Sequence, residues 1–330
     1  MAELDFLSAA GLVPVAQPVR QAGIAGIGRA LPRRVVESAE VEERLGLAAG
    51  WLERRTGIRR RRFAAAGERV SHLATVAAAR ALADADLSAS ELDLLLVATL
   101  SPDELTPNAA PLVAHELGTN VAAIDIGAAC TGFLSALALA GAYIETGRAR
   151  HALVVGAETM SRFTDHEDRR TAGLFGDGAG AIVLSPGSGS VGPVVLRSSG
   201  EHASLIVATH ERAVIEMEGH DTFVAATAFL CEATLEACRA AEVAIADVDL
   251  FVYHQANRRI LNAVAERLAL DPERVVDAIA DLGNTSAASL PLALADADDA
   301  GRLRSGARVL LAAVGAGFTY GATVIEWGRA

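Results

Sequence analysis

Asp93-Leu94-Leu95-Leu96-Val97 is a short apolar run, and it recurs 156 positions later as Asp249-Leu250-Phe251-Val252-Tyr253. An Ala-rich stretch with helical spacing precedes each run, at residues 72–87 and 228–243. Apolar runs of this length predict buried strands, and the stretches before them predict helices that cover those strands. The repeat therefore predicts two α/β halves of similar fold.

The same offset of 156 residues holds further along the chain. Asp125-Ile126-Gly127 matches Asp281-Leu282-Gly283, and Ala152-Leu153-Val154-Val155 matches Arg308-Val309-Leu310-Leu311. Helix, strand, Asp-x-Gly turn and strand are thus expected to recur in order without an insertion.

The register changes after residue 157. Gly180-Ala181-Ile182-Val183 matches Gly321-Ala322-Thr323-Val324 best, at an offset of 141. The first half therefore carries fifteen extra residues, roughly residues 158–174, and their many charges predict a surface insertion. Insertions on a rigid scaffold often hold binding residues.

Alternating helices and apolar strands predict mainly parallel sheets. We expect an N-terminal extension at residues 1–21, a first half at 22–185 and a second half at 186–330. A composition of 52% hydrophobic and 4% aromatic residues favours a large core of closely packed helices and parallel strands.

Charge and cysteine content exclude several classes of protein. A net charge of −12 disfavours general nucleic-acid binding, which depends on neutralising phosphates. Neither a signal peptide nor a transmembrane segment is expected. The three cysteines lack metal-ligand spacing and form no disulfide framework, so we expect no metal and a cytoplasmic location.

One segment departs from the acidic average. Six arginines crowd into nine positions beside Trp51, namely Arg54, Arg55, Arg59, Arg60, Arg61 and Arg62. They form either a solvated basic surface or an anion site, because guanidinium groups suit phosphates.

Cys130 lies in Ala128-Ala129-Cys130-Thr131-Gly132-Phe133, between a predicted strand end and a predicted helix at residues 134–145. Unpaired N–H groups at a helix N-terminus favour a thiolate, which is the nucleophilic form of cysteine. The small neighbours leave room for a substrate. The alternative is a buried structural cysteine.

Two polar residues of the second half lie where this fold predicts ligands. His254 directly follows a buried strand, and open α/β sheets place ligands at the carboxyl ends of strands. Asn284 lies in the turn that matches the Cys130 loop, and the offset aligns Ser286 with Cys130. Pseudo-twofold packing would bring these turns together, although His254 could be a surface histidine and Asn284 a turn residue or helix cap.

The chain resembles the β-ketoacyl-acyl-carrier-protein synthase III (ketosynthase III) family of the thiolase superfamily from about Gly23 onward. The resemblance implies a thiolase fold, with duplicated α/β halves forming a five-layer αβαβα core, and a homodimer. It rests on six segments in order: Trp51-Leu52-Glu53-Arg54-Arg55-Thr56-Gly57-Ile58, Ala129-Cys130-Thr131-Gly132-Phe133, Leu174-Phe175-Gly176-Asp177-Gly178-Ala179-Gly180-Ala181, His254-Gln255-Ala256-Asn257, Gly283-Asn284-Thr285-Ser286-Ala287-Ala288-Ser289 and Gly315-Ala316-Gly317-Phe318-Thr319.

The resemblance also implies a reaction. An acyl-CoA acylates Cys130, and decarboxylative condensation with malonyl-acyl-carrier protein then gives a 3-oxoacyl-carrier protein that starts a fatty-acid or polyketide chain. His254 and Asn284 would donate hydrogen bonds to the malonyl thioester oxygen, and His254 would help to activate the Cys130 thiol. The backbone N–H groups of Cys130 and Ala316 would form the oxyanion hole. No cofactor is implied, because the coenzyme A thioester is a substrate.

Binding positions follow from the same resemblance. It implies that Trp51 stacks on adenine with Arg169 on the other side, and that Arg55 lies near the phosphates. Gly219 and Asn257 would lie along the pantetheine arm, and Arg259 would contact the acidic carrier protein.

Three departures from the family pattern concern the cargo. Thr106 stands where members that use acetyl groups often carry an aromatic residue that reaches the partner's acyl pocket, which predicts room for a longer or branched acyl group. The segment at residues 198–215, expected near the pocket entrance, is shorter than is usual in the family. His220 replaces the usual Asn beside the pantetheine arm.

Two alternatives remain from the sequence. The same fold could transfer an acyl group from Cys130 to another acceptor without forming a carbon–carbon bond, although Asn284 chiefly serves decarboxylation. A non-enzymatic partner subunit would usually lack the cysteine. A thiolase is disfavoured, because the loop at residues 315–320 contains no second cysteine.

Overall fold

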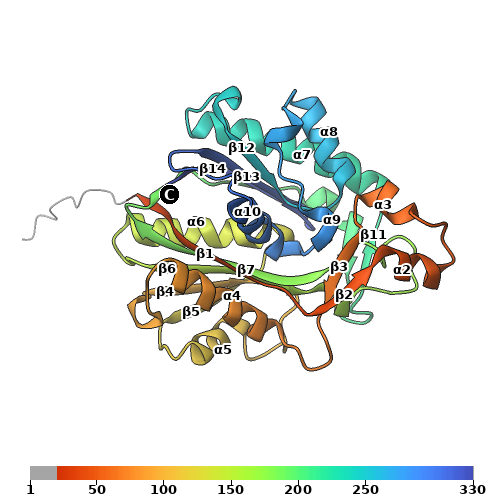
Figure 1. Cartoon of the computed structure of the whole chain (residues 1–330), viewed down its shortest axis with the longest axis horizontal. Coiled ribbons are helices and arrows are strands. Elements are labelled where there is room, and N and C mark those ends of the chain that lie inside the picture. The colour runs from red at the N-terminus through yellow and green to blue at the C-terminus, as the bar shows by residue number, and fades with distance from the viewer. Residues whose placement is uncertain (1–20, 330) are drawn as a thin grey trace, which may run out of the picture.

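The computed structural model describes residues 21–329 (Figure 1). The expected N-terminal extension, residues 1–21, lies outside the described residues apart from Gln21.

The first half forms a five-stranded sheet in the order β1-β7-β6-β4-β5. β4 pairs in parallel with both β5 and β6, whereas β7 runs antiparallel to β6 and to β1. β4 and β6 are buried on both faces, which explains why β4 is wholly apolar and β6 is apolar as far as Ala157. The strands span Ala22–Ala30 (β1), Leu94–Ala98 (β4), Ala122–Ile126 (β5), Ala152–Thr159 (β6) and Asp177–Pro186 (β7).

The second half repeats this sheet. β12 pairs in parallel with β13, β13 is antiparallel to β14, and β8 and β9 both pair with β14. Only an isolated parallel bridge between Phe251 and Val275 stands where the first sheet has β5. The strands span Gly189–Val191 (β8), Val195–Ser198 (β9), Leu250–Tyr253 (β12), Arg308–Gly315 (β13) and Thr319–Trp327 (β14).

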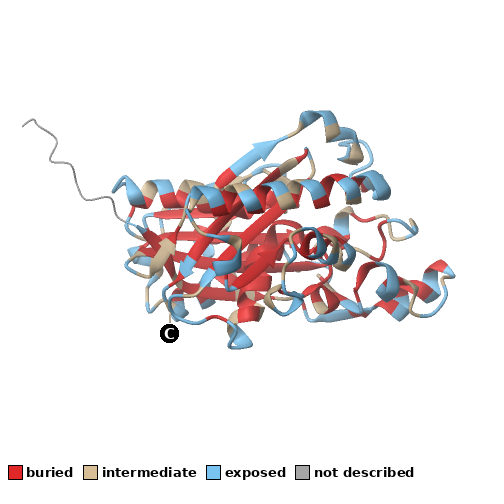
Figure 2. Ribbon diagram, turned by 90° about the horizontal axis from the view of Figure 1, so that it is seen from above, coloured by how far each residue is buried: buried red, intermediate tan, exposed pale blue. Residues whose placement is uncertain are grey.

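Helices separate and cover the two sheets in five layers (Figure 1). α6 (Gly132–Glu145) and α10 (Ser289–Asp299) lie between the sheets and share one apolar core with both. α4 (Val70–Asp84) and α5 (Ala109–Glu116) cover the first sheet, and α7 (Gly219–Ala240) and α8 (Arg258–Arg267) cover the second. Buried residues concentrate in the two sheets and on the helix faces toward them (Figure 2). The predicted αβαβα core is confirmed. The expectation of mainly parallel sheets is wrong, because β7 and β14 pair antiparallel with all their neighbours and make both sheets mixed.

The remaining elements gather at one end of the layers (Figure 1). β2 pairs with β3, and β10 pairs with β11 in a short hairpin. These elements span Arg34–Glu37 (β2), Ser38–Leu45 (α2), Trp51–Thr56 (α3), Arg60–Phe63 (β3), Ile206–Ala208 (β10), Ile215–Met217 (β11) and Ile279–Leu282 (α9).

The repeat needs one correction. α4 and α7 end at Asp84 and Ala240, 156 residues apart, but the short 3-10 helices η2 (Ala129–Thr131) and η7 (Ser286–Ala288) are 157 apart. Ala129 and Ser286 share the same left-handed backbone, with φ of 45° and 47°. The second half therefore contains one extra residue before η7, so the expectation of a repeat without an insertion is wrong. Ser286 corresponds to Ala129 rather than to Cys130.

The offset of 141 residues between Gly180 and Gly321 is confirmed. Gly180 pairs with Gly156, and Gly321 pairs with Ala313, so Gly180 and Gly321 hold equivalent places in the two sheets.

Two predicted segments differ from the structure. α7 begins at Gly219, nine residues before the expected start at residue 228, and its first turns lie against the cavity described below. The inserted residues 158–174 are not all at the surface. Arg162, Arg169 and Arg170 are exposed, but Glu158 and Thr171 are fully buried.

Candidate active site

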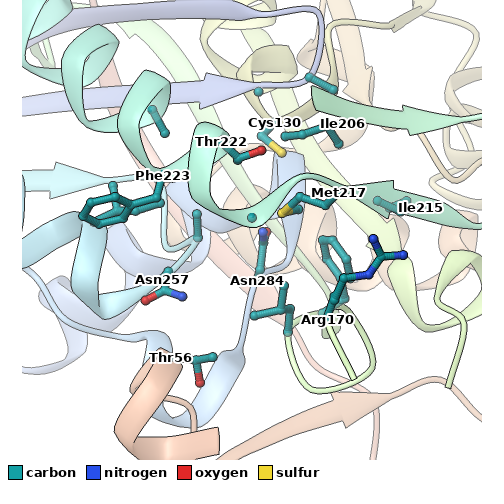
Figure 3. Close-up of a pocket in the computed structure, with 18 of the residues that line it drawn as sticks. Thr56, Cys130, Arg170, Ile206, Ile215, Met217, Thr222, Phe223, Asn257 and Asn284 are labelled. Carbon is teal, nitrogen blue, oxygen red and sulfur yellow. The ribbon is translucent and has the colours of Figure 1, made fainter. Parts of the chain in front are cut away.

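A cavity of about 740 Å³ lies between the halves, beside the 3-10 helix that carries Cys130. Nearly every residue singled out in the sequence lines it. Cys130, Asn257 and Asn284 are labelled among them in the close-up (Figure 3). The predicted site residues on its wall are Trp51, Arg55, Cys130, Arg169, Gly219, His254, Asn257, Arg259, Asn284 and Ala316. Thr106 is absent from this wall.

Cys130 lies in η2, directly before α6. Ala129 adopts a left-handed backbone that few residues other than glycine adopt, and this bends the chain sharply from β5 into the helix. Gly315 faces Cys130, and a Cβ on Gly315 would lie 2.7 Å from the Cys130 backbone nitrogen. The end of β13 can therefore approach the cysteine loop only with glycine at this position.

Cys130 is half-buried at the cavity wall, and its local surroundings determine its resting state. Desolvation raises the pKa of its thiol to about 12, the Ser286 hydroxyl acts against this rise, and the negative charge of Glu158 adds to it. The thiol is therefore protonated at neutral pH, and its ionisation requires help from neighbouring groups.

His254 follows β12 and is 2% exposed, so it is not a surface histidine. Its backbone N–H donates to the Ala312 carbonyl at 2.8 Å, which fixes it beside β13. Burial lowers the pKa of the imidazole to about 4. His254 is therefore neutral at physiological pH and can donate one N–H.

Asn284 joins the two halves at the cavity. Its N–H donates to the Leu174 carbonyl at 2.9 Å, and its own carbonyl accepts from the Gly176 N–H at 3.0 Å. Its side-chain Oδ1 accepts from the Ser286 N–H at 2.9 Å. This bond orients the amide, so its Nδ2 group is the one left to donate elsewhere.

Glu158 and Ser286 were missed as site residues. Both side chains are fully buried next to Cys130, and Glu158 stands at the end of the apolar strand β6. A carboxylate that ends a wholly apolar run is the sequence signal that could have identified Glu158, because buried charges are rare without a role.

Trp51 also lines the cavity. The Arg55 guanidinium lies over the Trp51 ring, 5.2 Å from its centroid, and Arg169 donates to the Leu45 carbonyl at 3.0 Å. The arginine segment is thus divided. Arg55 faces the cavity, Arg59 and Arg60 pair with Asp281, and Arg61 is buried.

Three further predicted contacts lie along the same wall. Asn257 caps α8, its Oδ1 accepting from the Arg259 N–H at 2.9 Å. The Arg259 guanidinium lies 5.8 Å from the centre of the Phe223 ring, and Gly219 begins α7. Thr56 and Asn257 lie away from Cys130 and Ile206 in the close-up (Figure 3).

Apolar side chains form the wall near the thiol. Ile206, Val207, Ala208 and Ile215 come from residues 198–215, the segment expected near the pocket entrance. Of these, Ile206 and Ile215 belong to one apolar cluster with Leu100, Met160, Phe175 and Met217. This part of the cavity can hold a hydrocarbon chain.

Thr106 and its neighbour Leu105 are exposed, the latter to 89%. β5 forms an edge of the first sheet, and Ile124 on it is 41% exposed. An exposed strand edge with apolar side chains is a typical surface for pairing with a second chain.

Within residues 21–329, no group of three or more His, Cys, Asp and Glu side chains could hold a metal ion. No helix of that range has the length and apolar character to cross a membrane.

Comparisons with known proteins agree on one family. The family model described as 3-oxoacyl-[acyl-carrier-protein] synthase III matches residues 124–200, and the model of its C-terminal part matches residues 238–327. A β-ketoacyl-[acyl-carrier-protein] synthase III of Bradyrhizobium diazoefficiens is 44% identical over 319 residues, which cover 92% of this chain and 98% of that protein.

Solved structures give the same result. The 3-oxoacyl-[acyl-carrier-protein] synthase III of Aquifex aeolicus is similar with a TM-score of 0.90 and 39% identity, covering 93% of this chain and all of that one. A priming β-ketosynthase from a polyketide biosynthetic pathway is similar with a TM-score of 0.91 and 34% identity, covering 96% and 99%.

Proposed function

Because the chain belongs to the 3-oxoacyl-[acyl-carrier-protein] synthase III family, we propose that it condenses an acyl group carried on Cys130 with malonyl-acyl-carrier protein. The observation that carries this proposal is the convergence of Cys130, His254 and Asn284 on one cavity. The product is a 3-oxoacyl-carrier protein, which begins a fatty-acid or polyketide chain.

Acylation is the first stage. The Cys130 thiolate attacks the carbonyl carbon of an acyl-CoA, and the backbone N–H groups of Cys130 and Ala316 bind the developing oxyanion. Collapse of the tetrahedral intermediate expels the CoA thiolate and leaves an acyl thioester on Cys130.

Decarboxylation and condensation follow. The neutral imidazole of His254 and the Nδ2 group of Asn284 each donate a hydrogen bond to the malonyl thioester oxygen, where negative charge builds as CO2 leaves. The resulting enolate carbon attacks the acyl thioester, and the Cys130 thiolate departs. A protonated His254 is not required, which agrees with a pKa near 4.

Two regions of the cavity bind two parts of the substrate, namely CoA and the acyl chain. The adenine and phosphates of CoA lie at Trp51, Arg55 and Arg169, and the pantetheine arm passes Gly219 and Asn257 toward Cys130. The apolar cluster around Met160 and Ile206 takes the acyl chain, and Thr106 of a second copy adds to it without an aromatic ring. Arg259 at the rim meets an acidic carrier protein.

The enzyme works as a homodimer in the cytoplasm in this account. The edge of β5, with Ile124 on it, supplies a pairing surface, and the neighbouring exposed loop around Thr106 would then reach the partner. The three cysteines are free, which suits a reducing compartment.

A product assay tests this function. The purified chain is incubated with acyl-CoAs of two to twelve carbons and with malonyl-carrier protein, and the carrier protein is weighed by mass spectrometry. We expect a 3-oxoacyl-carrier protein and one CO2 per turnover. Acyl groups moved to the carrier protein without loss of CO2 would instead identify a plain acyltransferase.

A further inference from the structure

Strands β13 and β14 are joined by a turn, Ala316-Gly317-Phe318, that carries one of the two proposed oxyanion donors. Gly315 and Thr319 face each other across the base of this turn. Gly315 packs directly on the cysteine loop, since a Cβ on it would lie 3.2 Å from the Cys130 Cβ. The position of the Ala316 N–H relative to Cys130 therefore depends on how the base of the turn is held.

Thr319 connects the turn to the cysteine loop through its side chain. Its Oγ1 lies 2.7 Å from Thr131 Oγ1 and 3.4 Å from the Ala128 carbonyl oxygen. Thr131 directly follows Cys130 in the sequence. In the described part of the chain, residues 21–329, this one hydroxyl makes both hydrogen bonds between residues 128–131 and residues 315–319. A single side chain thus joins the two segments that hold the proposed oxyanion donors.

The direction of these hydrogen bonds follows from the number of protons. The Thr131 hydroxyl lies 2.7 Å from the Ala128 carbonyl oxygen, and only the hydroxyl can donate in that bond. Its single proton is therefore used, and its oxygen can only accept from Thr319. Thr131 is 1% exposed, so an unpaired polar group there would be unfavourable. Thr319 is accordingly the donor that completes the chain of bonds.

The Ala128 carbonyl holds the bend that positions the Cys130 N–H. It accepts the Thr131 N–H at 3.0 Å as well as the Thr131 hydroxyl. Ala129, between them, has a φ of 45°, a left-handed conformation that alanine rarely adopts. Such a bend persists only where surrounding contacts hold it. The Thr319 hydroxyl supports it from the neighbouring strand.

The far side of the turn is held independently of the cysteine loop. The Ser199 N–H donates to the Phe318 carbonyl at 2.8 Å, and the Phe318 N–H donates to the Ser199 carbonyl at 2.9 Å. Ser198 on β9 pairs in register with Thr319. These backbone contacts fix the turn to β9, whereas the Thr319 side chain fixes it to the cysteine loop. Loss of that hydroxyl would leave the turn folded but free to shift relative to Cys130.

The separation of the two N–H groups determines how well they stabilise an oxyanion. Each donor must lie about 2.7–3.1 Å from the position that the oxyanion will occupy. A misplacement of about 1 Å can lower a rate by about 100-fold. A hydroxyl that joins the two segments can hold this separation from behind the wall, because neither Thr131 nor Thr319 lines the cavity itself.

We propose that Thr319 is a positioning residue for the acylation of Cys130. Its hydroxyl holds the Cys130 and Ala316 N–H groups at the separation at which both reach one thioester oxygen. Thr319 contacts no substrate, and it makes or breaks no covalent bond. This inference rests on the proposed function, in which those two N–H groups bind the oxyanion.

Two substitutions at one position test the hydroxyl while the shape of the strand is kept. Thr319→Val replaces the hydroxyl with a methyl group and keeps a β-branched side chain, which strands favour. Thr319→Ser keeps the hydroxyl. Thr323→Val is the matched control, because Thr323 also lies on β14, is fully buried and donates to the Gly192 carbonyl at 3.0 Å.

Two reactions of the same thiol separate oxyanion binding from the state of Cys130. Acylation by labelled acyl-CoAs of two to twelve carbons passes through an oxyanion, whereas alkylation by iodoacetamide does not. Thr319→Val should lower the maximal rate of acylation by about 10- to 100-fold. The acyl-CoA concentration at half-maximal rate and the iodoacetamide rate should change less than about twofold. Thr319→Ser and Thr323→Val should stay within about threefold of the unmodified protein in both reactions.

Three results would overturn the proposal. The first is acylation of Thr319→Val at an undiminished rate, the second is an equal loss in Thr319→Ser, and the third is a parallel loss of iodoacetamide reactivity. If no acyl-CoA acylates even the unmodified protein, the proposed function fails instead. The two N–H groups are then tested with p-nitrophenyl acetate, whose reaction with Cys130 forms the same kind of oxyanion without CoA, and the same ratios between variants are expected.

Discussion

The polar side chains around Cys130 owe their properties to burial. His254 is neutral because its imidazole is desolvated, and Asn284 presents Nδ2 because its Oδ1 is bound by Ser286 N. Both groups are therefore donors, with no positive charge between them. Such donors stabilise an anion that forms during the reaction without binding a resting carboxylate as an ion pair.

Replacing Asn284 separates the two stages of the reaction. Asn284→Ala should lower the rate of CO2 release by about 10²–10³, because one of two donors to the enolate oxygen is lost. Acylation of Cys130 should change only a few-fold. The two rates are measured by release of labelled CO2 and by transfer of a labelled acyl group.

Asn284→Asp is the matched variant. It keeps the oxygen that accepts from Ser286 N but replaces the Nδ2 donor with a second oxygen. We expect it to be as defective as Asn284→Ala in CO2 release. Normal decarboxylation by the Asp variant would show that Asn284 only shapes the loop.

At the residue scale, sequence predicted the positions but not the surroundings. Cys130, His254 and Asn284 could be identified from their places after strands and turns, and all three line the cavity. Glu158 was assigned to a surface insertion because its neighbours are charged. Its burial depends on contacts with Ser101 and Ala287, which are distant in the sequence.

The elements are held together by close backbone contacts. α4 lies so near β1 that a Cβ at Gly28 would be 2.3 Å from the Ala77 carbonyl oxygen. The Ala-rich sequence of α4 has this physical cause, since larger side chains would hold the helix away from the sheet.

Gly28→Ala should therefore destabilise the fold by about 1–3 kcal/mol, because β1 or α4 must shift. The control is Gly141→Ala in α6, where the added Cβ has no atom within 4 Å apart from its chain neighbours and its own helix backbone. That change should stabilise by about 0.5–1 kcal/mol, since alanine is the better helix former. Urea denaturation measures both, and equal stability of Gly28→Ala and the unmodified protein would contradict the packing argument.

At the element scale, strands were easier to predict than helix ends. The apolar runs around residues 94 and 250 became β4 and β12, because burial on both faces leaves a continuous apolar sequence. The start of α7 was missed because its first turn, Gly219-His220-Asp221-Thr222, lacks the apolar periodicity of a covered helix. The single-residue insertion was also invisible, since only backbone geometry aligns Ala129 with Ser286.

At the scale of the whole molecule, the edge strand β5 of the first sheet could pair with a second copy. Ile124→Glu should leave a monomer of 34.1 kDa, because pairing at β5 would bury the new carboxylates close together. Leu235→Glu on α7 is the matched control, since Leu235 is 40% exposed and Ile124 41%. Light scattering after size-exclusion chromatography should give a dimer for the unmodified protein and for the control. A dimer that survives Ile124→Glu would place the interface elsewhere.

At this scale the layered architecture followed from the internal repeat. The repeat predicted that two turns would meet, and η2 and η7 do pack against each other. The cargo could not be predicted, because the acyl wall combines residues from loops and from the β10–β11 hairpin that match no repeat.

The central claim is that Cys130 carries the acyl group, and intact-mass spectrometry tests it directly. After incubation with a panel of acyl-CoAs, the protein should gain the mass of one acyl group. Tryptic peptides should locate that mass on Cys130, and Cys130→Ala should gain none. No added mass with any acyl-CoA, or an acyl group on Cys231 or Cys238 instead, would contradict the account.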